Sequence, residues 1–162
     1  MQGRSRKLAA AIMAMIAITT IAYAQAIMGT ITLSTAEAVS VSAITDTFPA
    51  RSAGVREYTN TIGLDLSNGK GFKSGDDVVV RVELVPLDAE VYAGFRALII
   101  QIVVNASGPV ATLTMNTPYA EFKEKNISPG TYNYNVKIIF ATGYETVTAT
   151  IGLRVTIVGI LP

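Results

Sequence analysis

The side chains of this sequence that could do chemistry are limited to carboxylates, amides, hydroxyls, lysines and arginines, because its 162 residues include no Cys, no His and no Trp. This composition excludes disulfides, thiolate and imidazole metal ligands, cysteine nucleophiles and His-dependent triads. Asp88 and Glu90 are close in sequence, but they are typical turn residues and have no nucleophile beside them. We therefore expect no catalytic residues, no enzymatic activity and no small-molecule substrate.

The segment SNGKGFKSGDD, residues 67–77, superficially resembles a metal-binding or phosphate-binding loop. It lacks the GK[ST] ending of a P-loop and the 1, 3, 5 carboxylate spacing of an EF-hand. Its three glycines and Asn68 favour the positive φ angles of a tight turn. We interpret it as a hairpin connection, with a single calcium at Asp76 and Asp77 as the weaker alternative. No metal site and no cofactor are predicted.

Two tripeptides fit the acceptor pattern for N-glycosylation, Asn105-Ala-Ser107 and Asn126-Ile-Ser128. Asn126 is expected in a loop and is the better candidate. Asn105 lies at the end of an apolar stretch, so its modification depends on whether that end reaches the surface.

The N-terminus has the three parts of a secretory signal peptide. Residues 1–7 carry three basic side chains, residues 8–21 are uncharged and apolar, and Ala22 and Ala24 form the small-x-small cleavage pattern. Cleavage after Ala24 leaves 138 residues with 10 basic and 12 acidic side chains. The alternative is a retained helix, because the uncharged run continues to residue 36 and is long enough to span a bilayer. A signal peptide implies contact with the membrane only during export.

Residues 25–44 are predicted to form a β-strand. Ser and Thr alternate with Ile, Leu and Val in residues 30–34 and 39–42, which is the period-2 pattern of a half-buried strand. A strand tethered by the exposed link at residues 50–54 can close its own sheet or add to the sheet of a neighbouring subunit. The residues expected to join subunits in the second case are Ile27, Ile31, Leu33, Val39, Val41 and Ile44.

The rest of the sequence reads as strands separated by turns, with no βαβ alternation. The expected elements are strands at 55–66, 78–85, 95–105 and 109–115, a short helical turn at 87–94, a helical turn or loop at 118–126, and a final pair of strands at 132–140 and 146–157. The nearly continuous apolar run at 95–105 predicts a central strand covered on both faces. The final pair is predicted to form a long antiparallel hairpin, with Tyr132 and Tyr134 in core or rim packing.

These strands predict an all-β, Ig-like sandwich. We expect a signal peptide at 1–24, an N-terminal strand and link at 25–49, and the sandwich at 50–162. The charged fraction is 15% and the net charge is +1, which does not indicate a nucleic-acid partner.

One segment resembles a known family. Residues 78–104, VVVRVELVPLDAEVYAGFRALIIQIVV, combine a strand, an LDAE helical turn and a Phe-x-x-Leu-x-Ile-x-Ile strand, and an SGDD turn precedes them. This order resembles secreted archaeal filament proteins of the TasA/camelysin-like group, which includes archaeal bundling pilins and cannula subunits. The resemblance covers residues 60–158 at the level of strand order. It implies a jelly-roll-like sandwich, Sec export, and assembly by donor-strand complementation through the segment that follows the signal peptide.

Three functional hypotheses remain open. The first is a subunit of an extracellular, cell-surface filament or pilus, a homopolymer joined head to tail by a donated strand. The second is a type IV pilin-like subunit in which residues 8–38 stay as a filament-core helix; a mature N-terminus near residue 8 rather than Gln25 would favour it. The third is a monomeric secreted adhesion domain that keeps its own first strand.

Overall fold

The structure of the chain, a computed structural model, describes residues 38–104 and 108–162. These residues form strands with one short α-helix and one 3-10 turn between them. In chain order the elements are β1 (Val39–Val41), β2 (Ile44–Phe48), β3 (Ala53–Asp65), η1 (Asn68–Lys70), β4 (Asp77–Leu84), α2 (Ala89–Gly94), β5 (Phe95–Val103), β6 (Pro109–Thr114), β7 (Tyr119–Glu124), β8 (Thr131–Thr142), β9 (Val147–Ile151) and β10 (Leu153–Leu161).

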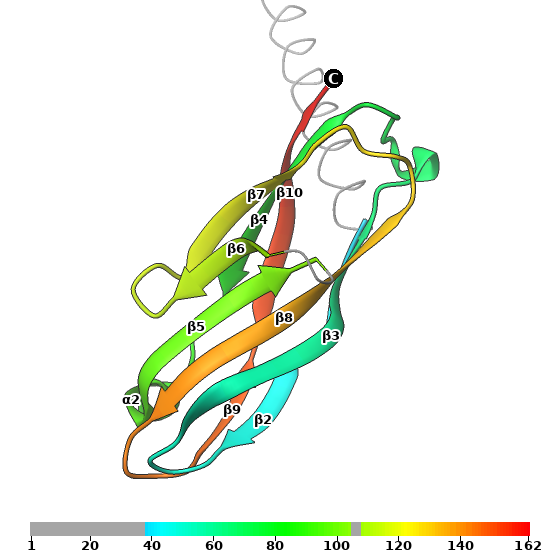
Figure 1. The fold of residues 1–162 in the computed structure, drawn as a ribbon. Coiled ribbons are helices and arrows are strands. Elements are labelled where there is room, and N and C mark those ends of the chain that lie inside the picture. The colour runs from blue at the N-terminus through cyan, green and yellow to red at the C-terminus, as the bar shows by residue number, and fades with distance from the viewer. Residues whose placement is uncertain (1–37, 105–107) are drawn as a thin grey trace, which may run out of the picture. The chain divides into compact units, whose positions relative to one another are not determined.

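The strands form two layers, as Figure 1 shows. One layer is a five-stranded antiparallel sheet in the order β1-β3-β8-β5-β6. The other layer contains the sheet β10-β4-β7 and the pair β2-β9. Only Gly152 separates β9 from β10, so the two are segments of one long strand. The predicted all-β sandwich is therefore confirmed.

The strand order is that of a jelly roll. We count β1 with β2 as the first strand and β9 with β10 as the eighth. The layer with β2 then pairs the first, eighth, third and sixth strands, and the other layer pairs the second, seventh, fourth and fifth. This nesting of two Greek keys places strands that are distant in sequence side by side.

The core lies between the inward faces of the two layers. In β4 the alternation predicted from the sequence is observed, because Val78, Val80 and Val82 are fully buried. On the opposite layer β8 buries Tyr134, Val136, Ile138 and Phe140, and Tyr134 is in contact with Phe122. The prediction that the Tyr132 and Tyr134 stretch packs in the core or at its rim is thus confirmed.

The two predicted hairpins are wrong. β8 pairs with β3 and β5, whereas β9 and β10 pair with β2 and β4 in the other layer. The turn at residues 143–146 therefore crosses between layers, and the apolar faces of β8 and β10 oppose one another across the core. The loop at 67–76 makes the same kind of crossing from β3 to β4. Alternation identified the buried face of strands such as β4 and β8, but it carries no information about which strand lies beside them.

Three smaller predictions can be compared directly. The helical turn before Gly94 is confirmed as α2. The helical turn or loop predicted at 118–126 is wrong, because this segment contains a strand, β7, of which Phe122 is the buried residue. The prediction that the strand at 95–105 is covered on both faces is also wrong: β5 is a central strand with only one buried face, because Ile99 and Val103 on its other face are partly exposed.

Candidate subunit-joining site

The first strand of the jelly roll is divided between the two layers. Residues Val39–Val41 form β1 and pair with Ile62 to Leu64 of β3, next to a hydrogen bond from the Ser42 amide to the Thr61 carbonyl of 2.9 Å. The chain then crosses the edge of the sandwich at residues 42–43 and continues as β2 in the other layer. The first strand therefore pairs with only part of the edge of each layer.

The second half of this strand is firmly held. Ile44 is opposite Ile151 in a five-residue register with β9, and Phe48 is opposite Val147. Phe48 is fully buried, with its ring centroid 5.2 Å from that of Phe95 and 4.8 Å from that of Phe140. Such edge-to-face aromatic pairs stabilise a core by more than the area they bury.

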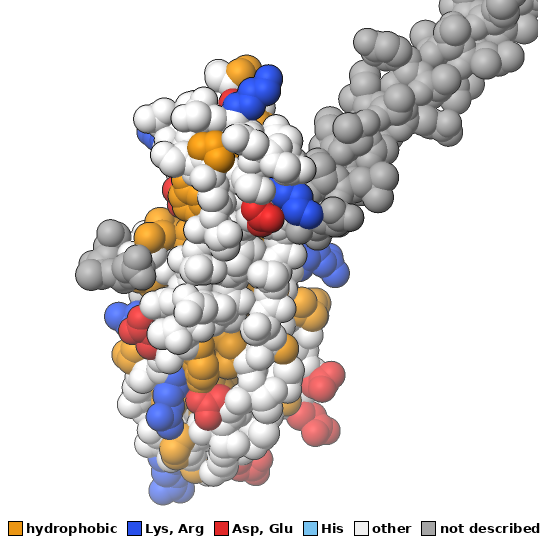
Figure 2. All heavy atoms as spheres, turned by 90° about the vertical axis from the view of Figure 1, so that its right-hand side faces the viewer, with side chains coloured by type: hydrophobic (Ala, Val, Ile, Leu, Met, Phe, Trp, Pro, Cys, Tyr) orange, Lys and Arg blue, Asp and Glu red, His pale blue; other side chains and the backbone are white. Residues whose placement is uncertain are grey.

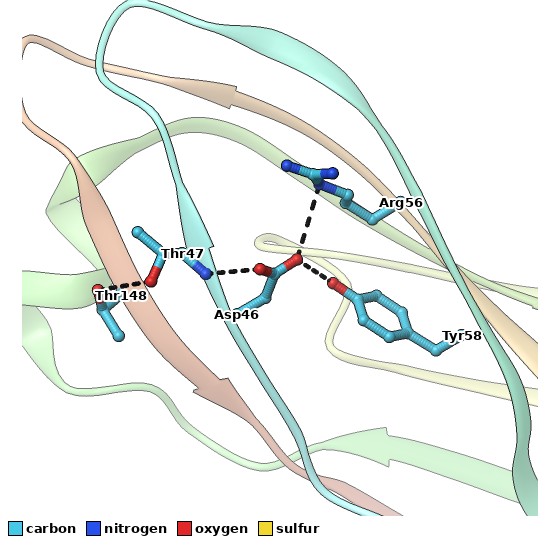
Figure 3. A network of polar contacts seen from close by, with 5 residues as sticks. All are labelled: Asp46, Thr47, Arg56, Tyr58 and Thr148. Atoms are coloured by element: carbon cyan, nitrogen blue, oxygen red, sulfur yellow. Dashed lines mark hydrogen bonds and ion pairs between the residues drawn. The ribbon is translucent and has the colours of Figure 1, made fainter.

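A polar network also ties β2 to β3 (Figure 3). The Asp46 carboxylate accepts hydrogen bonds from the Tyr58 hydroxyl and, at 2.7 Å, from the Thr47 amide. The Arg56 Nε atom lies 3.7 Å from the same carboxylate. On the far side of β2, the Thr47 and Thr148 hydroxyls are 3.1 Å apart. Because β2 and β3 belong to different layers, these contacts join the layers at the edge of the sandwich.

The same contacts shift two pKa values in opposite directions. The hydrogen bond from Tyr58, followed by the one from the Thr47 amide, lowers the pKa of Asp46 below 3.8. Burial, followed by the hydrogen bond to Asp46, raises the pKa of Tyr58 from 10.0 to about 12. The ionised carboxylate and the neutral phenol are therefore the stable pair over the whole neutral range.

An open strand edge lies beside this crossing. Because β2 pairs only with β9, β4 is the only strand among residues 38–104 and 108–162 that pairs with β10. The other edge of β10 has no hydrogen-bonded strand partner within that part of the chain, although β1 lies close to β10. The end of β10 also exposes apolar side chains: Val158 is 44% exposed, Ile160 43% and Leu161 48%. Such an edge can accept a further strand.

The surface near this edge carries no strong charge of either sign. Seen from the side on which β2 and β3 lie, hydrophobic side chains reach the surface between acidic and basic ones, and neither sign gathers into one patch (Figure 2). Arg154 of β10 itself pairs with Glu83 at 3.7 Å, and its side chain is 72% exposed. A strand that docks at this edge therefore does not cover a concentrated patch of charge of one sign.

The structure places half of the predicted subunit-joining residues. Val39, Val41 and Ile44 pair within the same chain, opposite Leu64, Ile62 and Ile151. Ile27, Ile31 and Leu33 lie outside the described residues, as do the cleavage-site residues Ala22 and Ala24. The sequence-based boundary began the sandwich at residue 50, but residues 39–48 pair and pack with it because Phe48 and Ile44 complete its core. The open edge of β10 had no signal in the sequence.

The remaining candidate residues are in loops or at the start of a strand. Asp76 accepts a hydrogen bond from the Lys73 amide at 2.9 Å. Asp77 accepts one from the Asn126 amide at 2.9 Å and pairs with Lys123 at 3.5 Å, so both carboxylates organise the ends of β4 and β7. Asn126 is exposed, and its glycosylation stays a prediction.

Asn105 lies outside the described residues. Within the described ranges, the structure contains no helix that is long and apolar enough to cross a membrane.

Comparisons with known proteins add little to this geometry. No protein-family model matches the chain, and no curated protein matches its sequence. Among solved structures, a sugar-binding protein, the EclA C-terminal domain, is 13% identical over 72% of this chain and 78% of its own, with a TM-score of 0.36. The acidic stable capsid structure of Helicobacter pylori bacteriophage KHP30 is 13% identical over 76% of this chain and 94% of its own, with a TM-score of 0.34. Neither likeness is strong enough to indicate a function.

Proposed function

We propose that this chain is a structural subunit of an extracellular filament, in which each subunit donates an N-terminal strand to the open edge of β10 in the next. The observation that carries the proposal is the incomplete first strand of the jelly roll. That strand first pairs with β3 in one layer, then crosses to the other layer and pairs with β9 over five residues, which leaves β10 without a strand partner on one side among the described residues.

The donated segment is residues 25–37, a shorter segment than the sequence pattern indicated. Residues 39–48 are held in their own sandwich by the pairing of β1 and β2, by buried Phe48 and by the Asp46–Tyr58 contact. Of the six predicted joining residues, only Ile27, Ile31 and Leu33 precede that held region. Burying each of these side chains contributes roughly 1.5–3 kcal/mol, and pairing along β10 adds main-chain hydrogen bonds.

The polymer follows from the geometry of donation. A strand given by one subunit and accepted at a different surface of the next is a heterologous contact, and such contacts propagate as open filaments when the rotation does not close. An exported chain without Cys and with a charged fraction of 15% fits a structural, non-catalytic role. The signal peptide and the resemblance to secreted archaeal filament proteins support an extracellular location.

Deletion of residues 25–37 tests the proposal. The mature chain should form filaments visible by electron microscopy, and the deleted chain should be a folded monomer by light scattering and circular dichroism. Filaments from the deleted chain, or a monomeric mature chain at high concentration, would refute it. The second result would instead support an adhesion domain that keeps its own strand.

A pair of substitutions tests the acceptor edge separately. Lys in place of Val158 puts a charge at the open edge and should block assembly, as charges do on natural edge strands. Val55→Lys is the matched control, because Val55 is also exposed, at 55%, but lies on β3 in the other layer. Equal loss of filaments in both variants would show that β10 is not the acceptor.

A further inference from the structure

A second candidate site lies at the end of the sandwich where the β2–β3 turn, the start of β5 and the β8–β9 turn meet (Figure 1). Arg51 and Arg96 reach the ring of Tyr144 from two different segments. Their guanidinium carbons lie 4.8 and 5.3 Å from the ring centroid. The three side chains line one side of a pocket of about 420 Å³ that Ser52 and Thr142 also line.

The two arginines concentrate positive charge at this pocket. Because both contact one ring, their guanidinium groups lie within about 10 Å of each other, the distance over which 0.1 M salt screens charges. Within the described ranges, neither guanidinium has a carboxylate at ion-pair distance, whereas Arg56, Arg81 and Arg154 each have one. A stacked ring orients a guanidinium while leaving its N–H donors available to a ligand.

The backbone around the pocket is fixed by hydrogen bonds between the three segments. The Arg51 amide donates to the Gly143 carbonyl at 2.7 Å, and the Gly143 amide donates to the Gly94 carbonyl at 2.9 Å. The Thr142 amide donates to the Ser52 carbonyl at 2.8 Å, and the Ser52 amide donates to the buried Thr142 hydroxyl at 3.0 Å. The arginines therefore project from a frame that needs no rearrangement to bind.

Arg51 also has an unusual backbone. Its φ is 51°, in the left-handed region that favours Gly and Asn. The other non-glycine residues with positive φ in the described ranges are Asn60 and Asn126, for which this region is common. A strained conformation at a side chain that lines a pocket is typical of ligand-binding positions.

We propose that Arg51, Arg96 and Tyr144 form a binding site for a phosphate or sulfate group, presented as the free anion or as an ester. Two guanidinium groups that line one pocket match the charge of a dianionic tetrahedral group, and a guanidinium can make bidentate hydrogen bonds to such a group. A monoanionic carboxylate satisfies only one of them. This site is independent of the strand-donation proposal, because it lies on turns that β10 and residues 25–37 do not form.

Ligand-observed ³¹P NMR tests the site on the full chain, since line broadening reports binding to a monomer and to a filament alike. Inorganic phosphate and methyl phosphate are the probes, and sulfate and acetate are the competitors. We expect broadening of both phosphorus signals, displacement by sulfate, and displacement by acetate only at concentrations about tenfold higher. If only the inorganic phosphate signal broadens, the site binds the free anion alone, and the proposal that it binds a phosphate ester is wrong.

Variants separate a built site from general positive charge. Arg51→Gly removes one guanidinium but suits the left-handed backbone, so its melting temperature should be unchanged or higher while phosphate affinity falls at least threefold. Arg96→Ala should have the same effect on affinity, and the double variant should not bind. Arg154→Ala removes an equal charge from β10 and should bind as the native chain does. Equal weakening by Arg154→Ala, or native affinity in the double variant, would overturn the proposal.

Discussion

Replacing Phe48 by Ala tests whether β2 is part of the sandwich of its own chain. Phe48 is fully buried and contacts both Phe95 and Phe140 edge to face. Loss of a buried Phe ring costs roughly 3–5 kcal/mol, because the transfer free energy is lost and a cavity remains. A domain of this size has a free energy of unfolding of about 5–15 kcal/mol, so Phe48→Ala should be severely destabilised and Phe48→Leu less so.

The assay is urea unfolding followed by far-UV circular dichroism, with native and variant chains measured at two protein concentrations. The difference in free energy of unfolding should be the same at both, because the contacts of Phe48 are within one chain. A double-mutant cycle with Phe140 should give a coupling of about 0.5–1.5 kcal/mol. Val55→Ala, at a side chain that is 55% exposed, is the control and should cost less than about 0.5 kcal/mol.

The result that would refute this reasoning is a small effect. If residues 44–48 were only a link, Phe48→Ala would behave like the Val55 control. If they were donated to a neighbour, the destabilisation would depend on protein concentration. Either result would show that the sandwich begins at residue 50, as the sequence predicted, and not at residue 39.

Two further predictions concern pH and packing. The wild type should lose stability relative to Asp46→Asn as the pH falls below 3.8, because the pKa of Asp46 is lowered in the folded chain. The wild type should lose stability relative to Tyr58→Phe as the pH rises from 10.0 to about 12, because the raised pKa of Tyr58 stabilises the folded chain only below that range. The free energies of unfolding in urea give both comparisons. If the difference between wild type and variant does not change with pH in either range, the Asp46–Tyr58 network is contradicted. Gly94→Ala should lower the melting temperature, since an added Cβ would lie 2.5 Å from Val147 Cγ2, whereas Gly108→Ala, with nothing within 4 Å, should not. Equal melting temperatures in the two variants would show that the end of α2 does not approach Val147 of β9 this closely.

The sequence predicted the positions of the strands far better than it predicted which strands pair with each other. The alternation of Val78, Val80 and Val82 and that of Val136, Ile138 and Phe140 each identified a buried face, and the structure buries all six side chains. Alternation depends on one strand at a time. Pairing depends on how each connection crosses the core, and the short turn at residues 143–146 allows either a hairpin or a crossing between layers.

Two strands were misread because their local signals are weak. In β7 the sequence YAEFKE has one buried residue, Phe122, and charged side chains that pair with the neighbouring strand: Glu121 lies 2.6 Å from Arg81 of β4. β2 was assigned to the N-terminal strand and link because Pro49 and Asp46 read as turn residues. The fact that Asp46 bonds Tyr58 on β3 is a tertiary contact with no sequence signature.

Both candidate sites depend on such long-range placement. Arg51, Arg96 and Tyr144 are widely separated in the sequence, and they come together only because the jelly roll returns three turns to one end. The open edge of β10 is likewise a property of the topology, because it exists only where the first strand crosses to the other layer.

A mixed disulfide tests strand donation most directly, since the native chain has no Cys and any disulfide must join introduced residues. One population of the mature chain carries Leu33→Cys. A second population, with a tag of different mass, carries Cys in place of Arg154, Thr156 or Val158 along β10. A disulfide needs Cα atoms within about 7 Å, so the three positions sample the register of the donated strand. Strand donation predicts a disulfide between the two tagged chains for at least one position. The absence of a disulfide between the two tagged chains at all three positions would contradict it.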